Sequence, residues 1–228
     1  ASGQELLDRS WRRRLDYALL AIVAAFLGLL NAFAMTPPVY ELQARLAALL
    51  NTRSEFLILT LLFLAGVIVL PLLASWGAAS LNRAVVVAPQ RPRRRDYVIR
   101  YAYGFVPVGF AIWTAHYLFH FLIGPLTIVP ALQGFFADVV GVPLLGAPNW
   151  TIAMQATMPL PAIRIIQMVA LAVGLWFGGR VIWRAAQEES QGNPLREALP
   201  WLILLLFLTL AAVYIFLQPM EMRGNVLG

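Results

Sequence analysis

Long apolar runs separated by short polar connections dominate the pattern of this 228-residue chain. Five runs approach the ~20 residues that a helix needs to cross the hydrocarbon core of a bilayer. Pro71 interrupts the second run and predicts a kink there, because proline removes a helical hydrogen bond. The pattern predicts an all-α, polytopic membrane protein with a single membrane domain over residues 1–228. The predicted spans are 17–35, 56–80, 98–123, 162–183 and 195–217.

Two of the outer connections are longer than tight turns. Leucines recur at helical spacing within residues 40–56, which predicts a short amphipathic helix on the outer membrane surface. The connection 124–161 is apolar and rich in proline, and Asp138 is its only charged residue. We expect this long outer loop to fold back onto the membrane face or to bind a partner. A lipid-facing interfacial loop is the alternative.

Charge gives the predicted orientation. Only 12% of the residues are charged, against about 25% in soluble domains, and 61% are hydrophobic. All 17 basic residues are arginines, and thirteen of them lie in the N-terminal tail and around the second and fourth connections. The positive-inside rule then places the N-terminus in the cytoplasm and the C-terminus outside. These features predict a multi-pass protein of the bacterial inner membrane.

The second connection is an arginine-rich cytoplasmic loop over residues 83–97. Such a cluster can be an orientation signal that contacts anionic membrane lipids. It can also be a docking patch for an acidic soluble subunit. Nucleic-acid binding is not expected, because one short loop lacks the interleaved aromatic residues that stack on bases.

The sequence carries no common signature of a self-contained enzyme or ion carrier. It has no cysteine, which excludes disulfides and thiolate metal sites within the chain. The motifs GxxxxGK[ST], HExxH and GxSxG are absent. The few carboxylates are expected at helix ends or in loops and not inside a span, which argues against a carrier built on buried acids. A non-catalytic subunit of an oxidoreductase complex fits these observations.

The stretch AHYLFHFLIG at 115–124 holds the only two histidines of the chain, His116 and His120. Residues four apart share one face of a helix. Trp113 and Gly109 extend the same face toward the cytoplasm. His116 lies ~27 Å along the helix from the start of the third span, which places the pair near the outer membrane boundary. A histidine there can be solvated or bonded to a neighbouring helix, or it can bind a cofactor.

Three cofactor hypotheses remain open for this pair. Two histidines on adjacent turns cannot take opposite faces of one haem, so haem b would need a methionine or a partner subunit. A copper site would combine His116 and His120 with outer methionines such as Met154 and Met158. A quinone pocket at the outer leaflet needs hydrogen-bond donors and aromatic rings. The residues that could line it are His116, His120, Trp113, Tyr117, Arg164 and Gln167.

Two stretches resemble the C-terminal membrane part of FesM-like membrane iron–sulfur proteins, which are related in outline to the NosR group. They are YGFVPVGFAIWTAHYLFHFLIGPLTIVPALQ at 103–133 and FLQPMEMRG at 216–224. The resemblance implies a role in membrane electron transfer and covers roughly a quarter of the chain. Without cysteine this chain cannot hold the iron–sulfur clusters of that family. The clusters would lie upstream or on another chain, or this is a cluster-free relative.

Together these observations predict an integral membrane subunit of a respiratory or electron-transfer complex. It would contact membrane lipids, anchor partner redox subunits, and contribute to a quinone or haem environment at the outer leaflet. A copper-handling membrane protein and a cofactor-free assembly scaffold are the alternatives.

Overall fold

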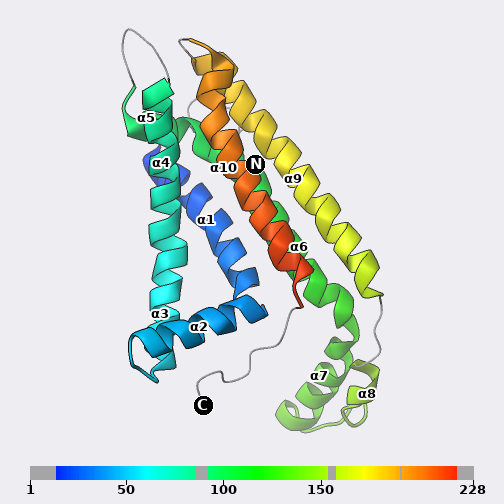
Figure 1. Cartoon of the computed structure of the whole chain (residues 1–228). Coiled ribbons are helices and arrows are strands. Elements are labelled where there is room, and N and C mark those ends of the chain that lie inside the picture. Colours follow the sequence, from blue (N-terminus) through cyan, green and yellow to red (C-terminus); the bar gives the residue numbers. More distant parts are fainter. Residues whose placement is uncertain (1–13, 86–91, 154–157, 191, 220–228) are drawn as a thin grey trace. The chain divides into compact units, whose positions relative to one another are not determined.

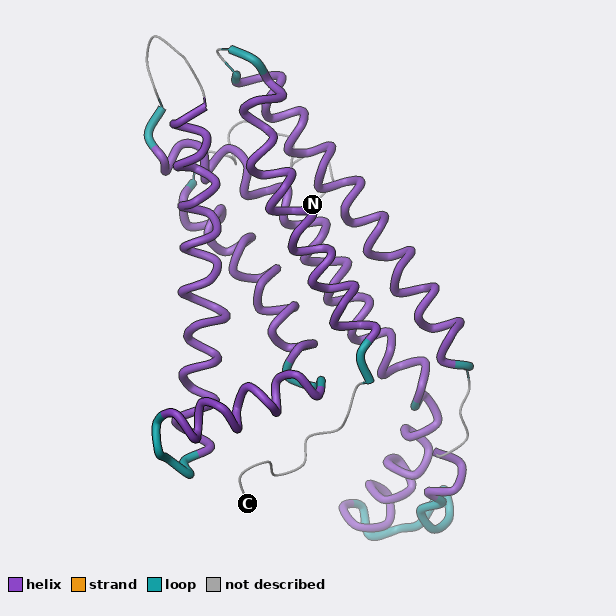
Figure 2. Tube along the Cα trace, in the orientation of Figure 1, coloured by secondary structure: helices purple, strands orange, loops and turns teal. Residues whose placement is uncertain are grey.

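The structure, a computed structural model, describes residues 14–85, 92–153, 158–190 and 192–219. Over these residues the chain consists of helices joined by turns and short links (Figures 1 and 2). This arrangement confirms the predicted all-α class. Contacts divide the chain into two compact units, one of residues 1–113 and 170–228 and the other of residues 114–169. The division falls inside two of the long helices, and each unit is described by itself below.

Within the described residues, five helices are long and apolar enough to cross a membrane, as the hydropathy pattern predicts. The second and third each contain one irregular turn, whereas the others are continuous. They are α1 (Leu15–Phe33), α3–η3–α4 (Glu55–Leu64, Ala65–Val69 and Leu70–Val85), α5–η4–α6 (Arg94–Tyr101, Ala102–Gly104 and Phe105–Ile123), α9 (Leu160–Glu189) and α10 (Pro194–Leu217).

Both irregular turns come just before a proline. The π-helical turn η3 precedes Pro71, and the 3₁₀ turn η4 precedes Pro107. A proline ring has no N–H to donate and clashes with the carbonyl four residues earlier, which favours a widened or tightened preceding turn, although α10 runs through Pro200 without one. The sequence therefore located the irregularity at Pro71, and the same reasoning accounts for the turn before Pro107.

In the first unit α1 packs against the second and third spans and against α10. Its buried face is built almost entirely from small residues: Ala18, Ile22, Ala25, Gly28 and Ala32. Such a face lets neighbouring backbones approach closely, which is how membrane helices gain packing energy without a hydrophobic driving force.

Glycines on α6 and α9 bring these two helices into equally close contact in the first unit. Gly174 and Gly178 on α9 form a GxxxG motif. A Cβ added at Gly174 would lie 2.5 Å from the Cβ of Ala111, and one added at Gly178 would lie 2.5 Å from the carbonyl oxygen of Gly104. Both positions therefore require glycine for the helices to pack as they do.

The amphipathic helix predicted within residues 40–56 corresponds to α2 (Pro37–Leu49). Its stripe of Val39, Gln43 and Ala47, spaced four apart, is buried in the first unit. Leu49 is 78% exposed and Leu42 is also exposed. The leucines are thus free to face lipid, while a stripe that includes a polar residue packs against the protein.

The second unit corrects the prediction of a loop over residues 124–161. Much of this segment is helical, because an apolar helical stretch runs over Pro125–Val139. Its elements are η5 (Pro125–Thr127), α7 (Ile128–Gly134), η6 (Phe135–Val139) and α8 (Trp150–Ala153). Gln133 ties the return segment to α7, since its amide donates to Leu145 O at 2.9 Å and accepts from Asn149 N at 2.9 Å. Local hydrogen bonds of this kind are not visible in hydropathy.

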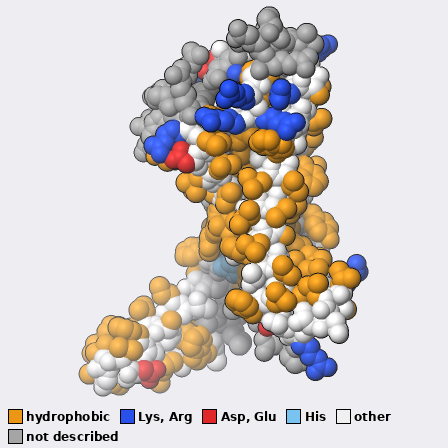
Figure 3. All heavy atoms as spheres, turned by 90° about the vertical axis from the view of Figure 1, so that its left-hand side faces the viewer, with side chains coloured by type: hydrophobic (Ala, Val, Ile, Leu, Met, Phe, Trp, Pro, Cys, Tyr) orange, Lys and Arg blue, Asp and Glu red, His pale blue; other side chains and the backbone are white. Residues whose placement is uncertain are grey.

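The arginine-rich connection is also shorter than the predicted loop over 83–97. Helix α4 continues to Val85 and α5 begins at Arg94, while residues 86–91 lie outside the described part. Figure 3 shows apolar side chains along one face of the molecule, with most of the visible arginines at one end of the helices and a few at the other. Gathering at one end is what the positive-inside rule requires, and the N-in, C-out orientation stays a prediction.

Candidate functional site

The histidine pair lies in the second unit on the last turns of α6. The rings of His116 and His120 have centroids 4.9 Å apart and are inclined by 79°. This geometry follows from their spacing of four residues, which stacks side chains on one helical face. His116 is only 2% exposed, and His120 is half-buried.

Gln167 of α9 reaches α6 one residue before His116. Its side-chain amide donates to the backbone carbonyl of Ala115 at 3.1 Å, and the residue is 1% exposed. Ile163 lies four residues before Gln167 and is fully buried, so the glutamine belongs to the packed stripe of α9. The structure thus brings together two residues that the sequence predicts for one site.

Two polar atoms in this cluster are buried and have no hydrogen-bond partner among the described residues. They are Nδ1 of His116 and Oε1 of Gln167. Leaving a buried polar group unpaired costs about 1–3 kcal/mol, and most such groups in native proteins are satisfied. An imidazole N–H can donate and an amide oxygen can accept, so together they offer the two hydrogen-bonding roles that a carbonyl- or hydroxyl-bearing ligand needs.

The other predicted site residues fall in different surroundings. Tyr117 is 56% exposed, and its ring lies 5.3 Å from that of His116. Arg164 is exposed, and Met158 is half-buried. Met154 lies outside the described residues, so the structure does not test its part in a copper site.

Trp113 belongs to the first unit, where it has a structural role. Its indole N–H donates to the carbonyl of Ala24 at 3.1 Å. A Cβ added at Gly28 would lie 2.8 Å from the same indole nitrogen, so the glycine makes room for the ring. This bond links α6 to α1. Sequence reasoning assigned Trp113 to the site because it shares a helical face with the histidines, which says nothing about neighbouring helices.

The residues present can be compared with the cofactors that the sequence suggests. An iron–sulfur cluster does not fit, because the chain has no cysteine to ligate it. The adjacent rings of His116 and His120 do not fit the opposite faces of a single haem. In the part of the chain that the structure describes, no group of three or more histidine, aspartate or glutamate residues gathers to hold a metal ion. His116 Nδ1 and Gln167 Oε1 offer the donor and acceptor roles that a quinone and its quinol would require.

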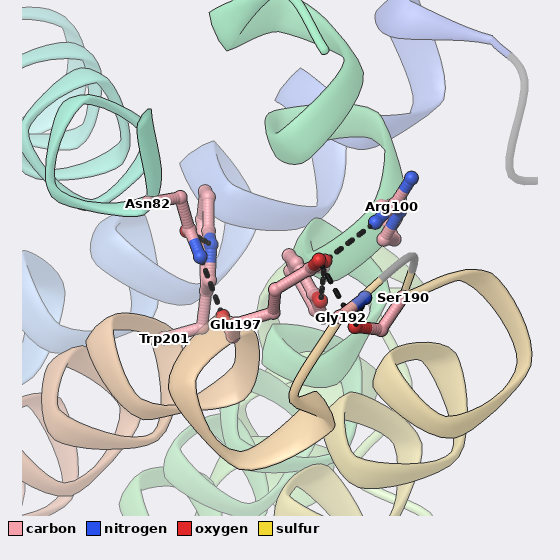
Figure 4. A network of polar contacts seen from close by, with 7 residues as sticks. Asn82, Arg100, Ser190, Gly192, Glu197 and Trp201 are labelled. Atoms are coloured by element: carbon pink, nitrogen blue, oxygen red, sulfur yellow. Dashed lines mark hydrogen bonds and ion pairs between the residues drawn. The ribbon is translucent and has the colours of Figure 1, made fainter. Parts of the chain in front are cut away.

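A second polar cluster lies in the first unit around Glu197, in the first turn of α10 (Figure 4). Glu197 is only 2% exposed, although the sequence places its carboxylates at helix ends without predicting burial. Its carboxylate accepts from Arg100 at 2.8 Å, from the Tyr101 hydroxyl at 3.3 Å and from the Ser190 hydroxyl at 3.0 Å. The buried charge is therefore paired and hydrogen-bonded.

The network continues through the backbone of the same residue to α4. Asn82 donates from its amide to the carbonyl oxygen of Glu197 at 2.6 Å and accepts from the Trp201 indole at 2.6 Å. The Trp201 ring also stacks on Tyr101 with centroids 5.6 Å apart. Asn82 and Trp201 are both fully buried. Because all these bonds are satisfied within the protein, the cluster joins α4, α5 and α10 and leaves no open ligand position.

Sequence reasoning missed Glu197, Asn82 and the polar residues of α2. A sequence signal existed for Glu197, since this acid lies four residues after the helix-capping Asn193, at the start of an apolar span. Its partner Arg100, however, lies 97 residues away in sequence.

Comparison with known proteins finds no matching family model, curated protein or solved structure.

Proposed function

We propose that this chain is an integral membrane subunit of a respiratory or other electron-transfer complex of the bacterial inner membrane. In this proposal it anchors partner redox subunits and binds a quinone beside His116. The observation that carries the proposal is the pair of buried atoms without partners, His116 Nδ1 and Gln167 Oε1. The five apolar helices support membrane insertion, which both parts of the proposal require.

The two atoms suit the two redox states of a quinone. A quinone carbonyl accepts a hydrogen bond, which a protonated Nδ1 of His116 can donate. A quinol hydroxyl donates a hydrogen bond, which Oε1 of Gln167 can accept. His120 lies 4.9 Å from His116, ring centroid to centroid, and is less buried, so it stands between His116 and the surroundings. In this proposal His120 passes protons between the bound quinone and the surroundings.

Electrons for such a quinone have to come from a redox centre outside these residues. Conversion of a quinone to a quinol takes up two electrons and two protons. This chain has no cysteine for an iron–sulfur cluster, so a partner subunit with its own redox centre would supply the electrons. The arginine-rich connection gives such a partner a basic docking surface, which would complement an acidic soluble subunit.

The test measures quinone binding by purified protein in lipid nanodiscs. A short-chain ubiquinone or menaquinone analogue is titrated against wild type, His116→Leu and Gln167→Leu. We expect each variant to weaken binding at least tenfold, because each removes one hydrogen-bonding atom from a buried site. Phe121→Ala is the matched control, since Phe121 is exposed on the same helix. Its affinity should equal that of wild type.

Unchanged affinity in both leucine variants would contradict the quinone proposal. The same preparations distinguish the alternatives. A reduced-minus-oxidised difference spectrum detects haem, and metal analysis detects copper. If the double variant His116→Ala/His120→Ala retains full activity of the complex, the pair serves no cofactor and the chain acts as a scaffold.

A further inference from the structure

A separate cavity opens in the first unit at the corner formed by α1, α2 and α3. Its volume is about 490 Å³, within the range of cavities that hold small ligands. Leucine, valine and phenylalanine side chains form most of its wall. Three neutral polar residues interrupt that apolar wall: Asn31 of α1, Gln43 of α2 and Thr60 of α3.

Gln43 is the main indication that the cavity binds something. It is only 2% exposed and lines the cavity, and none of the hydrogen bonds described for this chain involves its side chain. A buried amide is costly unless a partner satisfies it. Helix α2 packs the stripe that contains this glutamine against the protein and leaves Leu42 and Leu49 exposed. A ligand that bonds to Gln43 would satisfy its amide.

The chemistry of the wall defines the class of ligand. Among the described residues no charged side chain lines the cavity, so the wall they form offers no counter-charge to a phosphate or ammonium group. Amide and hydroxyl side chains can both donate and accept hydrogen bonds, which suits neutral carbonyl and hydroxyl groups. The apolar remainder of the wall suits a hydrocarbon tail.

The position of the cavity indicates where the ligand comes from. The cavity lies at the end of α1 and the start of α3, so it belongs to one end of two membrane spans. Phe56 and Phe63 line it and are both exposed, at the surface that would meet lipid. A molecule dissolved in the bilayer could therefore enter sideways, with its polar head at the depth of the interface.

We propose that this cavity binds a neutral amphiphile whose carbonyl or hydroxyl groups bond to Asn31, Gln43 and Thr60. Two membrane components share this chemistry: the ring of a quinone and the ester region of a neutral diacyl lipid. The proposal does not depend on the histidine site, because the cavity and the histidines belong to different units.

The experiment uses the full chain in nanodiscs and two probes, decyl-ubiquinone and a short-chain diacylglycerol. Affinity is measured for wild type and for Gln43→Leu, which keeps the size of the side chain and removes its amide. We expect the variant to weaken binding of one or both probes at least tenfold. Gln218→Leu is the matched control, because it makes the same change outside the cavity and should leave affinity unchanged.

The outcomes separate the ligand sources and the two sites. Binding of decyl-ubiquinone alone identifies a quinone, binding of diacylglycerol alone identifies a lipid, and binding of both supports the shared chemistry. Thr60→Val provides a second variant if Gln43→Leu lowers folding yield. The inference is overturned if neither probe binds wild type, or if both variants bind as wild type does. Loss of quinone binding in His116→Leu alone would support the histidine site and not this cavity.

Discussion

The close contact between α6 and α9 gives the sharpest prediction for stability. Replacing Gly178 by alanine adds a single methyl group to α9. That Cβ would lie 2.5 Å from the backbone carbonyl oxygen of Gly104 and 3.0 Å from Cδ2 of Leu205. A backbone oxygen cannot move aside as the end of a flexible side chain can. The two helices must therefore separate locally, and the contacts around this point are weakened.

The expected magnitude comes from two opposing effects. Overpacking of this kind typically costs about 1–3 kcal/mol. Alanine is also a better helix former than glycine, which returns about 0.8–1 kcal/mol at an interior helical position. The neighbouring Gly179 separates these effects, because its added Cβ would have Leu202 Cδ2 as its nearest neighbour at 3.8 Å, an ordinary contact. Gly179→Ala should therefore show only the gain in helix propensity.

The measurement is reversible unfolding in mixed detergent micelles, followed by far-ultraviolet circular dichroism. We expect Gly178→Ala to be less stable than Gly179→Ala by about 1–3 kcal/mol, the cost of the overpacked contact. Wild type should lie between them or close to Gly178→Ala, because Gly179→Ala alone gains helix propensity without overpacking. If both variants have the same free energy of unfolding, α6 and α9 do not meet at Gly178 in the folded protein, and the reasoning fails.

The same unfolding assay tests three further bonds. Arg100→Met should lower the free energy of unfolding by about 3–5 kcal/mol, because it leaves the buried Glu197 carboxylate without its cation. Adding Glu197→Gln to this variant should recover much of the lost stability. Equal stability of the single and double variants would contradict the ion pair. Asn193→Ala should cost about 1 kcal/mol by removing the cap of α10, and no loss would show that the cap is dispensable. Trp113→Phe should cost about 1 kcal/mol through the lost bond to Ala24, and an unchanged midpoint would argue against that bond.

The membrane spans were predictable from sequence because hydropathy records a local property. The first span illustrates this, since the predicted 17–35 and the observed Leu15–Phe33 differ by two residues at each end. The fourth span shows the limit of the method. Hydropathy ended it at Trp183, but α9 continues to Glu189 through Arg184 and its neighbours. A helix does not stop where it leaves the apolar phase, because its backbone hydrogen bonds continue equally well in water.

The partners of buried polar residues were not predictable in the same way. Helical spacing alone correctly paired His116 with His120, because that relation is local. It could not reveal the bond of Trp113 to Ala24, which depends on a helix 89 residues away in sequence. It also could not show which face of α2 packs against the protein, because neighbouring helices set that face. Long-range packing has no signature in a single sequence.

The polar residues buried in this protein fall into two kinds, and the difference bears on function. In a membrane, backbone and side-chain polar groups are satisfied internally or by something that is bound. Glu197 and Asn82 are satisfied internally, because every bond described for them ends on another part of the chain. His116 keeps hydrogen-bonding capacity that the described residues do not use, and Gln43 lines a cavity. Replacing residues of the first kind should therefore lower the stability of the fold. Replacing residues of the second kind by apolar residues of similar size should weaken ligand binding, while stability stays the same or rises.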